Sequence, residues 1–270
     1  MKSLSPQDLY LFDTMGFVLL QSLFSESEVV EIKQCLDSLD SPNSSFHNTD
    51  RFDDLIKKNQ LFKSLSKDHR IVSKASQVIN QPLRLIEGYA LKRIQGGYSS
   101  LHHGRVHDIV HSDGTVSSLG MSFHHTFHNG KLYCMFVKFL VYLDDILTDD
   151  DGPFCYVQGS HKANFSFPWD RHDTGKTYPI THYGFPSLET IHLKAGDVIL
   201  LNEALMHGAI PKKKSSERWL VAFSYSPAFM SDWGVQKRNI EDIYTTTHYE
   251  AGSEAKYLKK YLSELKELEE

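Results

Sequence analysis

The spacing of apolar residues along the chain changes character near residue 83. Before that point, apolar positions recur every three or four residues, as they do on one face of a helix. We predict a helix over residues 5–11, a strand over 16–20 and, after the capping box Ser25-Glu26-Ser27-Glu28, a helix that ends near Leu39. A polar loop over 40–48 and one or two helices over 53–80 follow. The apolar face of the capped helix consists of Val29, Val30, Ile32, Cys35 and Leu36.

From residue 83 onward, short runs of β-branched and aromatic residues alternate with turn residues, a pattern typical of antiparallel β structure. The Asn129-Gly130 pair favours a tight hairpin between two of these runs. Seven or eight strands behind a helical layer predict a mainly β fold with flanking α-helices: a double-stranded β-helix, or jelly roll, of the cupin-like type. The strands that we predict are residues 83–94, 123–127, 132–143, 154–157, 190–193, 197–202 and 219–226.

The chain of 270 residues fits one domain, since barrels and sandwiches of this size commonly do not split. We divide this domain into an N-terminal helical layer (1–82), a jelly-roll core (83–230) and a C-terminal helical tail (231–270). The tail contains a charged amphipathic helix from about residue 253. Its apolar stripe either packs on the body or forms the contact of a homodimer.

Composition and charge exclude several classes of protein. A formal net charge of -5 argues against a nucleic-acid-binding surface, which needs clustered Lys and Arg. No run approaches the roughly 18 consecutive apolar residues of a membrane span, and the first residues lack the apolar core of a signal peptide. We therefore expect a cytoplasmic protein without nucleic-acid or membrane partners. Cys35, Cys134 and Cys155 are too few and too irregular for a disulfide framework and fit reduced thiols.

Histidine is the compositional exception, with 15 residues of which seven fall between His102 and His128. Such a density favours a metal site. A second signal lies downstream, where His207-Gly208 follows an apolar strand and Arg218 begins the next one eleven residues later. In a jelly roll, neighbouring strands would bring both side chains to one barrel mouth. Imidazole binds first-row divalent metals, and a guanidinium grips a carboxylate through two hydrogen bonds.

This combination of apolar strand, His207-Gly208 and Arg218 resembles the distal half of the phytanoyl-CoA dioxygenase family. The acidic turn after Leu143 and the Gly159-Ser160-His161 motif are similar to that family as well, so the likeness extends from the N-terminal region to about residue 230. The resemblance implies an enzyme that binds Fe(II) and 2-oxoglutarate and uses O2 to oxidise a C–H bond of a small organic substrate, with release of succinate and CO2. It also implies that His207 is the distal metal ligand, that Arg218 binds the far carboxylate of 2-oxoglutarate, and that His161 is structural.

The proximal ligands depart from the family pattern, which has a His-x-Asp motif about ten residues after a lysine-bearing strand. Counting from Leu91-Lys92-Arg93 leads to His102, but Gly104 then stands at the carboxylate position. A literal His-x-Asp occurs at His111-Ser112-Asp113, which would need a longer preceding loop. We favour His102 because its spacing needs no insertion, with His111 and Asp113 as the alternative ligands. Asp108 or Asp113 is the candidate for a third ligand.

The identity of this third ligand decides between reactions. A complete set of His, carboxylate and His leaves the positions that hydroxylation requires. If Gly104 leaves a position vacant, the related iron halogenases suggest chloride there and hence halogenation. A third alternative is a jelly-roll binding protein that has lost its metal. We expect the loops 95–122 and 163–189 to surround the barrel mouth, with the second either a lid or a passive surface loop.

Overall fold

The structure is a computed structural model that describes residues 3–102, 125–163 and 188–228, together with the backbone of two short strands, β6 (Asp108–Val110) and β7 (Val116–Ser118). The predicted C-terminal tail and most of the predicted loop 163–189 therefore lie outside the described residues. No helix in the described part of the chain is long and apolar enough to cross a membrane.

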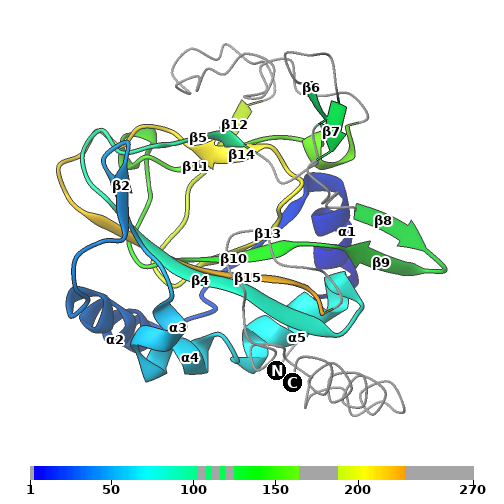
Figure 1. The fold of residues 1–270 in the computed structure, drawn as a ribbon, viewed down its shortest axis with the longest axis horizontal. Helices are drawn as coiled ribbons and strands as arrows, with labels where there is room; N and C mark the ends of the chain where they lie inside the picture. The colour runs from blue at the N-terminus through cyan, green and yellow to red at the C-terminus, as the bar shows by residue number, and fades with distance from the viewer. Residues whose placement is uncertain (1–2, 103–107, 111–115, 119–124, 164–187, 229–270) are drawn as a thin grey trace.

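Two antiparallel sheets face each other and form the body of the molecule (Figure 1). The larger sheet has the order β1 (Phe17–Leu20), β13 (Val198–Asn202), β10 (Val137–Tyr142), β15 (Arg218–Pro227), β4 (Leu83–Arg93), β3 (Thr49–Phe52) and β2 (Ser44–Phe46). The smaller sheet has the order β12 (Leu188–Ile191), β11 (Phe154–Val157), β14 (His207–Ala209) and β5 (Ser99–His102). This arrangement confirms the predicted mainly β jelly roll.

Helices cover the outer face of the larger sheet, where α2 to α5 lie along one side in Figure 1. Two of the helices begin at capping boxes, α1 (Pro6–Met15) after Ser5 and α2 (Glu26–Asp37) after Ser25. The other α-helices of the described residues are α3 (Leu55–Lys58), α4 (Gln60–Leu65) and α5 (His69–Ile79). The predicted helical layer is thus present, but Val30 does not belong to the apolar face of α2, because 49% of its surface is exposed.

The period-2 alternation of strand side chains gives the larger sheet two different faces. In β10, Val137, Phe139 and Val141 pack in the core shared with the helices, whereas Leu140 and Tyr142 pack in the core between the sheets. Strand β15 repeats this pattern, with Val221 towards the helices and Leu220 between the sheets. Polar residues at the strand positions that alternate in step with Leu140 and Leu220 therefore face the space between the sheets. Four cations do so, namely Arg51, Arg93, Lys138 and Arg218.

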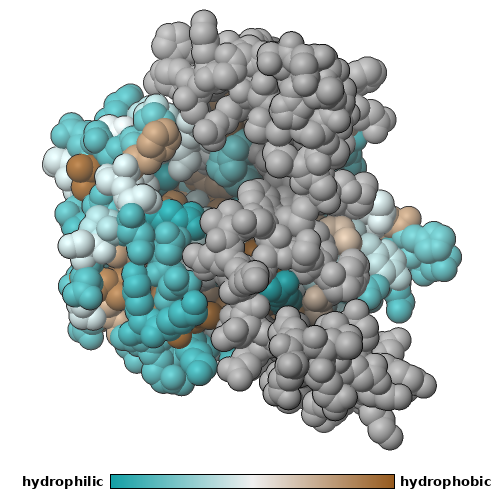
Figure 2. Space-filling view, viewed as in Figure 1, coloured by the Kyte–Doolittle hydropathy of each residue, from teal (hydrophilic) through white to brown (hydrophobic). Residues whose placement is uncertain are grey.

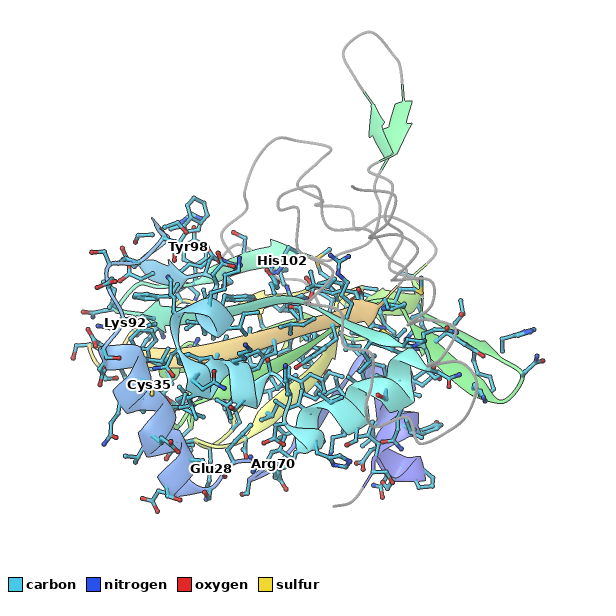
Figure 3. The ribbon with its side chains drawn as sticks, turned by 60° about the horizontal axis from the view of Figure 1, so that its bottom comes forward. Glu28, Cys35, Arg70, Lys92, Tyr98 and His102 are labelled. Carbon is cyan, nitrogen blue, oxygen red and sulfur yellow. The ribbon has the colours of Figure 1, made fainter. Side chains whose placement is uncertain are left out.

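Hydrophilic residues cover most of the described part of the face drawn in Figure 2, where hydrophobic residues form only small separate patches. In the view of Figure 3, Glu28 and Arg70 lie on the helical side of the molecule, and Tyr98 and His102 lie towards the smaller sheet. Glu28 and Arg70 form an ion pair of 2.6 Å. His102, on β5 of the smaller sheet, lines a cavity that residues of the larger sheet line as well.

Several strand boundaries differ from those predicted. The expected strand 132–143 is divided at Met135-Phe136 into β9 (Lys131–Cys134) and β10, because β9 instead pairs with β8 (His125–His128) in a separate ribbon. The turn of this ribbon confirms the predicted hairpin, with positive φ at Asn129 and Gly130. The strands β2, β3, β5, β6, β7 and β14 were not predicted. They have only three or four residues each and few β-branched side chains, so their pairing rather than their composition defines them.

Candidate metal centre

His102 and His207 are register partners on the adjacent strands β5 and β14 of the smaller sheet. Their ring centroids lie 4.3 Å apart, with an angle of 51° between the ring planes. His207 is buried with 5% of its surface exposed, while His102 is exposed. The structure thus brings together the two imidazoles that sequence reasoning favoured, at a distance that one metal ion can bridge.

Both imidazoles are fixed in the same tautomer by backbone carbonyls two residues earlier in the chain. The Nδ1 of His102 lies 2.8 Å from the carbonyl oxygen of Ser100, and the Nδ1 of His207 lies 2.7 Å from that of Leu205. A carbonyl oxygen only accepts hydrogen bonds, so the proton resides on Nδ1 in each neutral ring. The lone pair is then on Nε2, where it can bind a metal ion. Metal-binding histidines are commonly held in the required tautomer by such a hydrogen bond from the other ring nitrogen.

Gly208 permits the close approach of the two histidine-bearing strands. A Cβ at this position would lie 2.6 Å from the carbonyl oxygen of Ser99 and 3.0 Å from that of Ser100. Both atoms belong to the backbone of β5 and cannot move aside cheaply. The glycine of the His-Gly motif therefore has a physical role, because a side chain there would separate His102 from His207.

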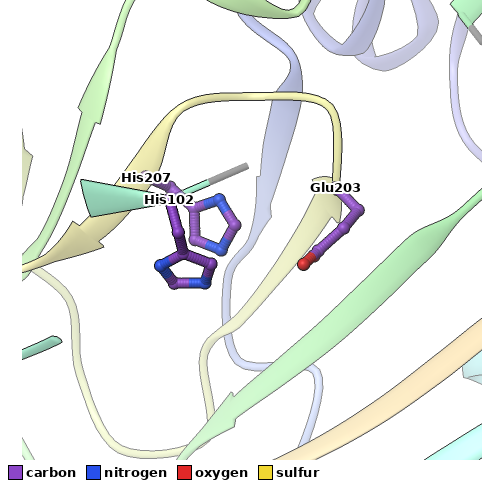
Figure 4. Close-up of side chains that lie close together, drawn as sticks. All are labelled: His102, Glu203 and His207. Atoms are coloured by element: carbon purple, nitrogen blue, oxygen red, sulfur yellow. The ribbon is translucent and has the colours of Figure 1, made fainter. Parts of the chain in front are cut away.

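A third potential ligand, Glu203, follows strand β13 and was not singled out by the sequence reasoning. One donor atom from each of His102, Glu203 and His207 lies within 4.8 Å of the others (Figure 4). Glu203 is 2% exposed, and its Oε2 is buried without a hydrogen-bond partner among the described residues. Two imidazoles and one carboxylate form the facial triad of non-haem Fe(II) oxygenases, so the donors present fit that metal. A carboxylate one residue beyond the apolar run Val198–Leu201 was the signal that could have identified Glu203.

Lys138 keeps this carboxylate in place from the neighbouring strand β10. Its Nζ donates a hydrogen bond of 2.8 Å to the Oε1 of Glu203 and lies 3.8 Å from the Oε1 of Glu87. Burial disfavours the charge on Lys138, but Glu203, Tyr89 and Glu87 outweigh this effect and raise the pKa of Lys138 above its ordinary value. The ammonium group is thus charged at neutral pH and holds the side chain of Glu203 in position through this hydrogen bond.

Arg218 lies at the start of β15 and faces the same cavity of about 420 Å³ as both histidines. Its Nη1 donates to the carbonyl oxygens of Asp151 and Gly152, while its Nε is buried without a hydrogen-bond partner among the described residues. Burial lowers the pKa of Arg218. Its carboxylate neighbours are already engaged, Asp151 with Lys214 at 2.7 Å and Asp144 with Lys33 at 2.6 Å. A guanidinium in this situation suits an anionic ligand.

The other residues weighed as ligands do not enter the described part of the site. Gly104, His111 and Asp113 lie outside the described residues, and only the backbone of Asp108 is described. The choice of His102 over His111 therefore remains a prediction, as does a ligand role for Asp108 or Asp113. His161 is buried away from the cavity and its Nε2 donates to the carbonyl oxygen of Asp13 at 2.9 Å, which supports the structural role implied for it.

The jelly roll has two imidazoles and a buried arginine around one cavity, and a buried carboxylate next to the imidazoles. This is the architecture of the iron- and 2-oxoglutarate-dependent oxygenases. The family model for phytanoyl-CoA dioxygenase (PhyH) matches residues 12–218. The chain belongs to the phytanoyl-CoA dioxygenase family.

Solved structures with the same fold include an enzyme from Streptomyces hygroscopicus, HygX. Its structure with nickel and 2-oxoglutarate bound is 41% identical, covers 90% of this chain and 94% of HygX, and has a TM-score of 0.79. The HygX structure with nickel, 2-oxoglutarate and hygromycin B bound is 41% identical, covers 89% and 94%, and has a TM-score of 0.77. The epimerase SnoN from nogalamycin biosynthesis, at 19% identity, 85% and 86% coverage and a TM-score of 0.59, shares the fold. No functionally curated protein matches the chain.

Proposed function

We propose that this protein is an Fe(II)- and 2-oxoglutarate-dependent oxygenase that hydroxylates a C–H bond of a small polar organic molecule, with release of succinate and CO2. The observation that carries the proposal is the meeting of His102, Glu203 and His207, whose two imidazoles line the cavity that Arg218 also faces. His102, Glu203 and His207 would hold the iron, and Arg218 would bind the distal carboxylate of 2-oxoglutarate. When bound, iron and 2-oxoglutarate supply the activation of O2.

The protein itself holds the proposed metal ligands in position and keeps water out of the cavity. The carbonyl oxygens of Ser100 and Leu205 hold the imidazoles in the required tautomer, and Lys138 holds the carboxylate of Glu203. The apolar side chains of the inter-sheet core close the floor of the cavity and exclude water from it. Leu140, Tyr142, Phe154 and Leu220 belong to this floor.

The cavity lining supports a polar substrate. Towards one end it is formed by Ser44, His47, Arg51 and Tyr98, which offer hydrogen-bond donors and acceptors rather than a continuous apolar surface. His47 and Tyr98 stack with their ring centroids 4.1 Å apart and form a flat wall. HygX, which has been solved with hygromycin B, is a relative that accommodates a polar natural product. A substrate of that chemical character fits the cavity of this chain.

Halogenation is the less favoured reaction. That alternative depended on a missing carboxylate at Gly104, which would leave a metal position for chloride. Glu203 offers a buried carboxylate from another strand, so the substitution at Gly104 does not imply a vacancy. A binding protein without metal is also disfavoured, because it would leave the buried Oε2 of Glu203 without any partner among the described residues, and buried polar atoms are rarely left so.

The proposal is tested by adding Fe(II) and 2-oxoglutarate to the protein without oxygen. A weak visible charge-transfer band is expected, and the His207→Ala variant should lack it. On admission of O2, wild-type protein should convert 2-oxoglutarate to succinate. An absence of both the band and succinate in wild-type protein would overturn the assignment.

A further inference from the structure

Arg93 and Arg218 are register partners on the adjacent strands β4 and β15. Both lie on the inner face of the larger sheet and face the cavity that contains the two histidines. Their exposed fractions are 3% for Arg93 and 4% for Arg218. Two guanidinium groups are therefore buried side by side at one wall of the candidate site.

The described contacts of Arg93 are with uncharged groups. Its Nε donates to the Oγ1 of Thr49 at 3.2 Å, and its Nη2 donates to the Oγ of Ser99 at 2.6 Å. Neither Arg93 nor Arg218 forms an ion pair with a carboxylate in the described part of the chain. Burial, and then the charge of Arg218, lower the pKa of Arg93 to about 9, so the group still carries its charge at neutral pH.

The other two cations of the same cavity are neutralised by carboxylates. Arg51 pairs with Asp53 at 2.7 Å and with Glu87 at 3.1 Å, and Lys138 pairs with Glu203 at 2.8 Å. Among the four cations of the cavity, Arg93 and Arg218 are thus the two that lack a carboxylate partner in the described part of the chain. We call the side of the cavity that they form the Arg93 and Arg218 wall. Two desolvated like charges destabilise a folded protein, and an anion bound between them offsets this cost.

We propose that Arg93 is a second binding residue for the distal carboxylate of 2-oxoglutarate, which it shares with Arg218. This inference rests on the proposed function and extends it. A carboxylate has two oxygens and about four acceptor positions, so it can accept hydrogen bonds from two guanidinium groups at once. Thr49 and Ser99 each accept one hydrogen bond from Arg93 through a hydroxyl oxygen. These bonds orient the guanidinium group without neutralising its charge.

The test measures binding rather than turnover, by titrating Ni(II)-loaded protein with 2-oxo acids in a calorimeter. One ligand is 2-oxoglutarate, and the other is 2-oxobutanoate, which keeps the metal-binding end but lacks the distal carboxylate. Arg93→Met should weaken the binding of 2-oxoglutarate by roughly 10- to 100-fold, the effect of losing one or two charge-assisted hydrogen bonds. The binding of 2-oxobutanoate should change by less than about threefold, because it makes no contact with this wall.

Lys92→Met is the matched control, because Lys92 is the neighbouring cation on the opposite face of β4, where it pairs with Glu217 at 2.8 Å. It should alter neither titration. Arg93→Gln serves as a second variant, since it removes the charge but keeps an amide donor for Ser99 or Thr49. It should show the same selective loss for 2-oxoglutarate. The melting temperature of each Arg93 variant should also be measured without ligand. It should fall no further below that of wild type than the loss of the hydrogen bonds to Thr49 and Ser99 explains.

An equal weakening of both 2-oxo acids, or no weakening of either, would overturn the role of Arg93 while leaving the proposed function intact. Another result would contradict both the role of Arg93 and the proposed function. If wild-type protein binds Ni(II) but shows no preference for 2-oxoglutarate over 2-oxobutanoate, the distal carboxylate has no binding wall at all. The proposed function and the inference about Arg93 then both fail.

Discussion

Lys138 donates a hydrogen bond of 2.8 Å to the Oε1 of Glu203 and leaves the Oε2 of the same carboxylate buried without a hydrogen-bond partner among the described residues. Lys138 lies on β10, and Glu203 follows β13, the strand paired with β10. The larger sheet thus supplies a positioned carboxylate, while the smaller sheet supplies both imidazoles. Metal binding would join the two sheets at the mouth of the barrel.

Removal of the carboxylate charge tests whether Glu203 binds the metal. Glu203→Gln should weaken the binding of Ni(II) or Fe(II) by at least about tenfold, since even the loss of an outer partner of a metal ligand has an effect of that size. The measurement is an anaerobic calorimetric titration. Glu217→Gln is the control, because Glu217 is exposed and pairs with Lys92 outside the cavity. If the Glu203 and Glu217 variants bind the metal with equal affinity, Glu203 is not a ligand. Asp108 and Asp113 are then the remaining candidates for the carboxylate ligand.

Removal of the cation should have a different effect. Lys138→Met leaves the carboxylate of Glu203, whose side chain is 3% exposed, without its ion-pair partner. The free energy of unfolding should fall by about 3–5 kcal/mol, the usual effect of removing one member of a buried ion pair. Urea denaturation of the metal-free protein measures this change.

The double variant Lys138→Met with Glu203→Gln is the control for this experiment, because it removes both charges. It should be more stable than Lys138→Met alone. Added Ni(II) should stabilise Lys138→Met more than it stabilises wild type, since the metal then neutralises an otherwise unpaired carboxylate. Additive effects of the two substitutions would show that the ion pair is not coupled as its geometry indicates.

The sequence could predict what depends on local pattern and on a motif with fixed spacing. The change of periodicity near residue 83 predicted the helical layer and the jelly roll, and the His207 to Arg218 spacing predicted two residues that line the cavity. Strand β5 could not be predicted, since Ser99–His102 has little apolar pattern and forms only by pairing with β14.

Glu203 was missed for a related reason. The motif placed the carboxylate two residues after His102 in the chain, whereas the structure brings one from the turn after β13, about a hundred residues away in the sequence. The pairing of β5 with β14 brings these positions together, because His102 is the register partner of His207, and Glu203 precedes His207 by four residues. Contacts of this kind depend on the register between strands, which a single sequence does not show.

A methyl group at Gly208 should disturb the metal centre without removing a ligand. The added Cβ of Gly208→Ala would lie 2.6 Å from the backbone oxygen of Ser99, so β5 must move away from β14. Because His102 is on β5 and His207 is on β14, the separation of the imidazoles should increase and the affinity for Ni(II) should fall by roughly tenfold or more. Calorimetry measures the affinity, and circular dichroism establishes that the fold is retained.

Gly159→Ala is the comparison for Gly208→Ala, since a Cβ at Gly159 has no heavy atom within 4 Å and lies outside the metal centre. Its φ of +75° makes an alanine there strained, so it should lower stability by about 1 kcal/mol. Its affinity for the metal should remain that of wild type. If Gly208→Ala binds Ni(II) as tightly as Gly159→Ala does, close approach of the two strands is not what assembles the site.

Protonation of the buried His161 should destabilise the protein in mild acid. Its Nε2 donates to the carbonyl oxygen of Asp13, and its Nδ1 is buried without a hydrogen-bond partner among the described residues. Burial is the main cause that lowers the pKa of His161 to about 4, and the nearby charges of His125 and Lys162 act in the same direction, against Asp13. An unfolded chain has a histidine pKa of about 6.5, so between pH 6.5 and 4 the unfolded state binds a proton that the folded state does not.

The contribution of neutral His161 to stability is therefore complete above about pH 6.5 and is lost as the pH falls towards 4. The free energy of unfolding should decrease by up to about 1.4 kcal/mol per pH unit in this window on account of this residue. His161→Gln, whose amide can still donate to Asp13, should show a smaller decrease than wild type, whereas His192→Gln should behave as wild type because His192 is exposed. Urea denaturation at pH 7, 6, 5 and 4.5 measures the difference. Parallel curves for wild type and His161→Gln would mean that His161 is protonated in the folded protein at the same pH as in the unfolded chain, so that its burial has no effect on its pKa.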